Sequence, residues 1–140
     1  MIWIGIDPGE HTGLAVWDTD RNELVAVMTV PIHRAMDAVR MWRDDSEALT
    51  VVFEDARQRK WFEREKDNAE YRGKLMGAGA AKRDARIWEE FLEDSDIACL
   101  KVPPRPGMTK WNADTFARVT GWKGRTSNHA RDAAMLVWGR

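Results

Sequence analysis

The chain has a single cysteine, Cys99, and no apolar run long enough to cross a membrane. One thiol cannot form a disulfide within the chain, which argues against a disulfide-stapled secreted domain. A membrane-spanning helix needs about 20 mostly apolar residues, and charged residues interrupt every apolar run before that length. The N-terminus also has no basic-then-apolar layout of the kind found in signal peptides. We therefore expect a cytoplasmic protein with no membrane partner.

An excess of charge of one sign is also missing, since 22 Lys and Arg residues stand against 23 Asp and Glu residues. The charges are unevenly distributed, however. Residues 1–50 carry 4 basic and 9 acidic side chains, whereas residues 101–140 carry 8 basic and 2 acidic ones. A basic C-terminal part on a nearly neutral chain is a candidate surface for a polyanion such as nucleic acid. Compositional scatter is the alternative explanation.

The length of 140 residues and an apolar content of 44% predict one folded domain over residues 1–140. Tight polar turns join the first three predicted strands, and helices precede the last two, which predicts an α/β fold. The expected architecture is a mixed five-stranded sheet flanked by helices, with the first strand in its centre and parallel to the fourth. The predicted strands are residues 2–7, 13–18, 24–30, 49–55 and 97–102, and the predicted helices are residues 33–47, 73–94, 112–121 and 128–138.

Two acidic residues close the strands that are expected to be neighbours in the sheet. Asp7 ends the first strand and Glu54 lies at the end of the fourth, so both are expected at the sheet edge where α/β proteins bind ligands. Neighbouring carboxylates oppose each other's ionisation, and a divalent cation such as Mg²⁺ or Mn²⁺ removes that conflict. Alternatively, Asp7 only caps the Pro-Gly turn that follows it. Strand alternation places Asp55 on the opposite face from Glu54.

The last predicted helix carries His129 and Asp132 on one face, because three residues separate them. Met135 continues that face, so the face is expected to point into the protein, where a carboxylate needs a partner. Joining Asp7 and Glu54 in one site would supply that partner. The alternative is an exposed Asp132 in the first turn, where the helix dipole favours an acid.

Three segments occur in a fixed order: GIDPG around Asp7, VVFED around Glu54, and HARDAAML around His129 and Asp132. Together with the order of strands and helices, they resemble the RuvC-type Holliday-junction resolvases of the RNase H-like superfamily, in particular the compact phage members. The resemblance covers nearly the whole chain and implies an RNase H-like fold in a bacterial, possibly phage-encoded, protein. Asp7, Glu54 and Asp132 match three metal-binding acids of the family. His129 stands where many members have a fourth acid.

The resemblance implies a structure-selective endonuclease that hydrolyses phosphodiester bonds in four-way (Holliday) DNA junctions. Asp7, Glu54, His129 and Asp132 would be its catalytic and metal-binding residues, with two Mg²⁺ or Mn²⁺ ions in each active site. A four-way junction needs two cuts, so a homodimer is expected. Ile87 and Phe91, on the helix predicted over residues 73–94, are candidates for the contact with the second subunit.

The candidate DNA-binding residues fall into a basic group and an aromatic pair. Basic side chains can neutralise phosphates, although an ordinary solvated side chain is the alternative for each of them. The aromatic pair, in the charged segment RQRKWFER, could stack on exposed bases or wedge a branch point open. It could equally anchor the segment to the core or to a second subunit. The basic group is Lys110, Lys123, Arg125 and Arg131, and the aromatic pair is Trp61 and Phe62.

Three other functions share features with this one. Another RNase H-like nuclease, acting on flaps, other branched DNA or RNA–DNA hybrids, would use the same acids. A non-catalytic protein that binds branched DNA would tolerate His129 in place of an acid. An actin-like ATPase begins with a similar GIDPG segment, but that fold needs two lobes and 140 residues hold only one.

Overall fold

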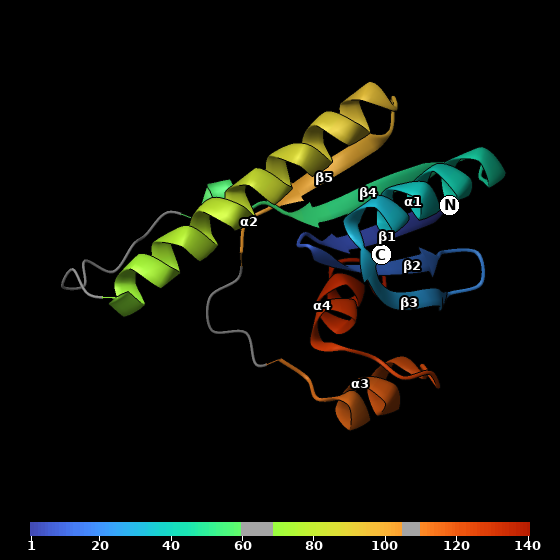
Figure 1. Ribbon diagram of the computed structural model, residues 1–140. Helices are drawn as coiled ribbons and strands as arrows, with labels where there is room; N and C mark the ends of the chain where they lie inside the picture. Colours follow the sequence, from blue (N-terminus) through green and yellow to red (C-terminus); the bar gives the residue numbers. More distant parts are fainter. Residues whose placement is uncertain (60–68, 105–109) are drawn as a thin grey trace.

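The computed structural model describes residues 1–59, 69–104 and 110–140. They form one mixed five-stranded sheet with helices against it (Figure 1). Within these residues no helix is long and apolar enough to span a membrane. The strands are β1 (Ile2–Asp7), β2 (His11–Asp18), β3 (Glu23–Pro31), β4 (Leu49–Glu54) and β5 (Ala98–Val102). The helices are α1 (Ile32–Asp45), the short 3-10 helix η1 (Ala56–Gln58), α2 (Ala69–Asp94), α3 (Ala113–Thr120) and α4 (Asn128–Val137).

The strand order across the sheet is β3-β2-β1-β4-β5. Strand β1 lies in the centre, antiparallel to β2 and parallel to β4, and β5 continues the parallel half. The predicted α/β class and the predicted pairing of the first and fourth strands are therefore confirmed. The largest shift of a boundary is at α2, which begins at Ala69 rather than at residue 73. Residues 69–72 hold no Pro or Gly that would stop the helix earlier.

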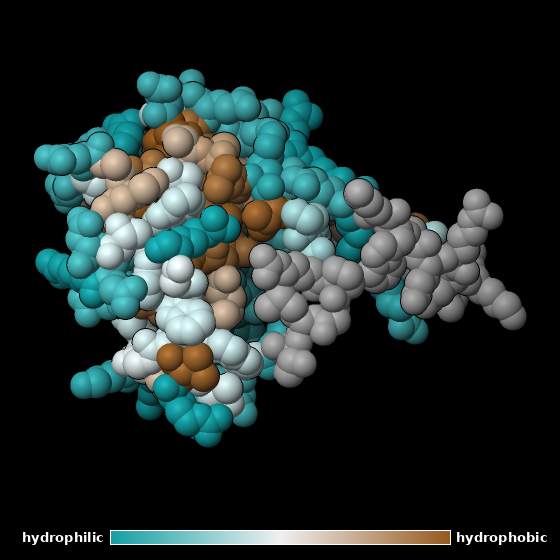
Figure 2. Space-filling view, turned by 180° about the vertical axis from the view of Figure 1, so that it is seen from behind, coloured by the Kyte–Doolittle hydropathy of each residue, from teal (hydrophilic) through white to brown (hydrophobic). Residues whose placement is uncertain are grey.

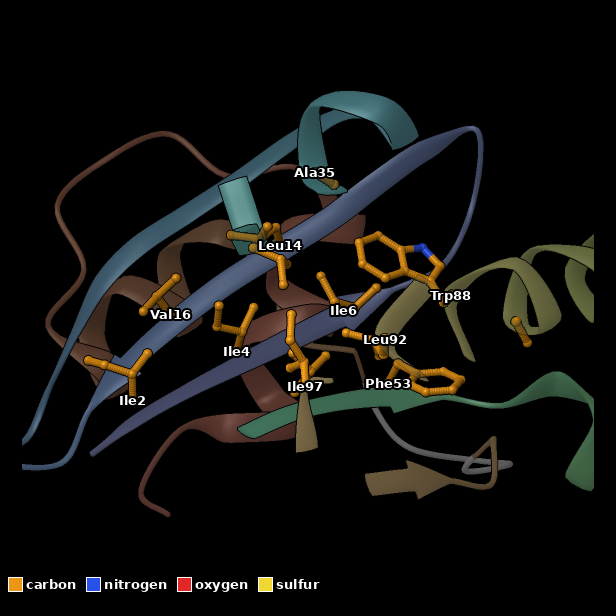
Figure 3. Close-up of a cluster of buried hydrophobic side chains, with 13 residues drawn as sticks. Ile2, Ile4, Ile6, Leu14, Val16, Ala35, Phe53, Trp88, Leu92 and Ile97 are labelled. Carbon is orange, nitrogen blue, oxygen red and sulfur yellow. The ribbon is translucent and has the colours of Figure 1, made fainter. Parts of the chain in front are cut away.

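One face of the sheet is covered by α1 and α2. Alternation along β1 directs Ile4 and Ile6 to this face, where they meet apolar residues of β4 and α2. Figure 3 shows Trp88, Leu92 and Phe53 gathered around Ile6. Helical spacing predicts an apolar stripe of Ala81, Ala85, Trp88 and Leu92 along α2, and the last three of these residues are buried here.

Helix α4 covers the other face and lies unusually close to the strands. A Cβ atom added to Gly13 would stand 1.9 Å from the carbonyl oxygen of His129, and one added to Gly5 would stand 2.0 Å from that of Ala133. Only glycine permits this approach of helix backbone to sheet, and neither residue has a positive φ. Gly13 is the direct partner of Asp7 in the β1–β2 register. The two glycines therefore fix how near α4 comes to the end of β1.

The first half of α2 extends beyond the sheet (Figure 1). It exposes Leu75 and Met76, with 41% and 78% of their surface accessible, whereas the buried residues of the helix begin at Ala85. Phe91, one of the two candidates for contact with a second subunit, is partly buried and packs edge-on against Trp88 at 5.6 Å. The Arg40 guanidinium covers the other ring surface of Phe91 at 4.9 Å. Ile87 remains 37% exposed.

Most of the tryptophans in the described residues are only partly buried. Of the seven tryptophans within the described ranges, only Trp17 and Trp88 are buried. Trp111 and Trp138 meet edge-on at 6.2 Å, and the Arg140 guanidinium lies 5.0 Å from the ring of Trp3. Seen from behind (Figure 2), the molecule carries a central band of pale and brown residues bordered by hydrophilic ones. Such half-exposed indoles are common in surfaces that contact partners.

Candidate active site

The centre of the candidate site is a contact between Asp7 and His129. Asp7 is the last residue of β1, and His129 lies in the first turn of α4. The His129 Nδ1 atom is 2.8 Å from Asp7 Oδ2. Ser127 fixes the start of α4 as its N-cap, because its hydroxyl oxygen accepts a hydrogen bond from the Ala130 N–H. The same hydroxyl contacts Thr29 of β3, which ties the helix start to the sheet.

Glu54 and Asp132 lie near this pair. Ile6 and Phe53 are partners in the parallel β1–β4 register. Asp7 and Glu54 are the next residues of these two strands, so both lie at the same edge of the sheet. Burial raises the pKa of Asp7 and outweighs its hydrogen bond to His129, and the charge of Asp132 raises it further. Burial also raises the pKa of Glu54, followed by the charges of Asp7 and Asp132. The three predicted acids therefore share one electrostatic environment.

Lys110 supplies a positive charge to this acidic group. Its ammonium donates a hydrogen bond to Asp132 Oδ2 at 2.7 Å. That bond raises the pKa of Lys110, and the charges of Asp132, Asp7 and Glu54 act in the same direction. The side chain of Lys110 is 69% exposed and that of Asp132 is 30% exposed. The sequence proposed Lys110 for a phosphate contact, and its partner in the structure is an acid of the site.

The donor set suits a hard divalent cation, since it consists of carboxylate oxygens and one imidazole. Burial first, and the neighbouring acids next, raise the pKa of Asp7 and Glu54, and a lysine lies beside Asp132, so a bound cation would offset the charge of this group. Across residues 1–59, 69–104 and 110–140, no three His, Cys, Asp or Glu side chains are already grouped as metal ligands. Instead, the Asp7 carboxylate contacts His129, and the Asp132 carboxylate accepts a hydrogen bond from Lys110.

Asp55 takes no part in this group, in agreement with strand alternation. Burial alone would favour its neutral form, but hydrogen bonds from the Arg57 side chain and backbone hold the pKa of Asp55 below its usual range. The Arg57 guanidinium joins Asp55 to Glu89 of α2, at 2.8 and 2.7 Å. This ion-pair network fastens η1 to α2.

Arg131, which the sequence offered for a phosphate contact, forms hydrogen bonds inside the protein instead. It is only 9% exposed. Its guanidinium donates hydrogen bonds to the carbonyl oxygens of Trp111 and Thr126, to the Thr126 hydroxyl and to the Asn128 side chain. These bonds hold the segments before α3 and α4 against the start of α4. The burial of Arg131 could not be predicted from its place near a helix start, because it depends on contacts with residues distant in sequence.

The other predicted DNA-binding residues divide into two groups. Lys123 and Arg125 are exposed in the loop between α3 and α4. Trp61 and Phe62 lie outside the described residues. The sequence also left Arg59 unassigned, although its positive charge lowers the pKa of nearby Glu54. Gly5 and Gly13, which lie under α4, were likewise given no role. The sequence feature that could have indicated one is a glycine within an apolar strand.

Comparison of the chain with protein-family models and with curated protein sequences found no match.

Proposed function

We propose that this protein is a metal-dependent endonuclease that cuts four-way DNA junctions, as the resemblance to RuvC-type resolvases implies. One observation carries the proposal. Asp7, Glu54 and Asp132, which lie far apart in the sequence, act on one another's charges at one sheet edge, with His129 hydrogen-bonded to Asp7. A crowded set of carboxylates in which burial raises the pKa of two members, here Asp7 and Glu54, is typical of functional sites rather than of ordinary surfaces.

The fold supports an RNase H-like assignment. Its sheet has an antiparallel half, β3-β2-β1, and a parallel half, β1-β4-β5. The two central parallel strands end in Asp7 and Glu54, and the last helix returns to the same edge with His129 and Asp132. This is the arrangement of acids that the family resemblance implies.

Asp7, Glu54, Asp132 and His129 would hold Mg²⁺ or Mn²⁺, which supplies an activated water and stabilises charge on the phosphate and the leaving oxygen. The protein contributes position and charge. Gly13 keeps α4 close enough for His129 to bond to Asp7 and orient its carboxylate. With 56% of its side chain exposed, His129 also faces solvent, where substrate would arrive.

DNA binding must come from other residues, because the acids repel phosphate. Exposed Lys123 and Arg125 lie in the loop that leads into α4 and are suited to phosphate contacts without base specificity. Lys110 lies at the acidic cluster itself and can reach a phosphate that enters the site. Trp61 and Phe62 remain candidates for probing the branch point. Arg131 is left out of this set because its guanidinium is used inside the protein.

We assign the dimer contact to the projecting half of α2. Leu75 and Met76 are exposed there, and Ile87 is exposed further along the same helix. Exposed apolar side chains on a projecting helix are suited to packing against a second copy of the chain. A two-fold dimer places two sites on one symmetric junction.

Substrate competition tests the function. A labelled four-way junction, a flap and an RNA–DNA hybrid are incubated with the protein in Mg²⁺ or Mn²⁺. A resolvase cuts the junction at paired symmetric positions in preference to the others. Preferred cleavage of the flap or hybrid would favour another RNase H-like nuclease, and binding without any cleavage would favour a non-catalytic protein.

A further inference from the structure

We propose that Lys110 is a built-in counter-cation of the acidic cluster, which a divalent metal ion must displace from Asp132 before it can bind. Lys110 thereby weakens metal binding in the free protein. This inference rests on the proposed metal site, and it adds a residue that sets the site's affinity for the ion.

The position of the ammonium supports displacement. Its 2.7 Å contact with Asp132 Oδ2 occupies one of the two carboxylate oxygens that Asp132 could offer a metal ion. The ammonium also lies close enough to Asp7 and Glu54 for their charges to act on it. An ammonium and a metal ion in the same carboxylate group repel each other, so one must leave when the other enters.

The main chain at this position is anchored while the side chain is free to move. The next residue, Trp111, accepts a 3.0 Å hydrogen bond at its carbonyl oxygen from the buried Arg131. Lys110 itself is 69% exposed, and exposed ion pairs are weak enough to be exchanged. Its backbone can therefore stay in place while the ammonium swings away from the cluster.

A displaced Lys110 remains beside the site with its charge available. The same ammonium can then pair with a DNA phosphate in place of Asp132. Metal loading would in this way release a phosphate-binding group next to the acids, and binding of metal and of DNA would assist each other.

Calorimetric titration with Mn²⁺, without DNA, tests the inference in the full chain. We expect Lys110→Met to bind Mn²⁺ about three- to fivefold more tightly than the wild type, because no exposed ion pair has to be broken. Lys110→Arg keeps the charge and should bind Mn²⁺ like the wild type. Lys101→Met is the matched control, since Lys101 pairs with Glu89 of α2. It removes an ion pair outside the acidic cluster and should leave Mn²⁺ affinity unchanged.

Thermal unfolding supplies a second readout. Without metal, Lys110→Met should unfold at a lower temperature than the wild type, and saturating Mn²⁺ should raise its Tm by a larger amount. Equal or weaker Mn²⁺ binding by Lys110→Met, with a wild type that binds, overturns the inference and leaves the metal site standing. Absence of Mn²⁺ binding in both proteins overturns the metal site and the inference together.

Discussion

Replacing Gly13 by alanine tests whether the close approach of α4 to the sheet holds the site together. The new Cβ would lie 1.9 Å from the His129 carbonyl oxygen, and real Cβ contacts do not fall below 3.0 Å. The start of α4 must therefore retreat by at least 1.1 Å (3.0 − 1.9). A retreat of that size directed away from β1 lengthens the 2.8 Å contact between His129 and Asp7 to about 3.9 Å (2.8 + 1.1), beyond hydrogen-bond range.

Two effects follow from this retreat. Overpacking of this kind costs about 1–3 kcal/mol, which lowers the Tm of a domain of this size by about 3–12 °C. Misplacement of catalytic groups by about 1 Å lowers a rate by about 100-fold, so cleavage should fall far more than the folded fraction does.

Differential scanning calorimetry and junction cleavage at a temperature where both proteins are folded measure the two effects. Gly77→Ala is the matched control, because a Cβ there meets no other segment within 4 Å among the described residues. It should stabilise α2 by about 0.5–1 kcal/mol, whereas Gly13→Ala should destabilise the protein. A Gly13→Ala protein with wild-type Tm and wild-type cleavage would refute the argument.

The remaining predictions concern charge, anchoring and assembly. Burial raises the pKa of Asp7, so the wild type loses stability as pH rises above the ordinary value of 3.8. Metal-free Asp7→Asn should therefore have the higher Tm at pH 7, with the difference vanishing below pH 3.8; a difference that does not change with pH would contradict this. Asp55 has the opposite shift, since its bonds to Arg57 lower its pKa. Asp55→Asn should cost about 1–3 kcal/mol at pH 7 in chemical denaturation, and the loss should shrink as pH falls below 3.8. Arg131→Met should lower the Tm without changing the salt dependence of DNA binding, whereas Arg125→Met should reduce that salt slope by about one and leave the Tm unchanged. Met76→Asp should convert a dimer into a monomer in sedimentation velocity, and a wild type that is already monomeric at the same concentration would exclude the proposed contact.

The sequence predicted the parts of this fold that depend on periodicity. Alternation in β4 separated Glu54 from Asp55, and the structure gives each a different environment. Helical spacing likewise placed Ala85, Trp88 and Leu92 in the core. Both patterns are local, so they can be recognised without knowing which elements meet.

Features that depend on contacts between distant segments were missed or misassigned. Arg131 was expected to bind phosphate, because its burial depends on Trp111 and Thr126, which lie on other segments. The contacts of Phe91 with Trp88 and with Arg40 of α1 were not predicted either. The pairing of Lys110 with Asp132 spans 22 residues and has no periodic signal.

Cleavage of a labelled four-way junction by the wild type and by Asp7→Asn, each with Mg²⁺ or Mn²⁺ and each with chelator, is the most direct test of the proposed acidic metal site. We predict paired symmetric cuts by the wild type only when metal is present, and junction binding without cuts by Asp7→Asn. Equal cutting by the two proteins, or cutting by the wild type in chelator, would contradict the assignment of catalysis to these acids.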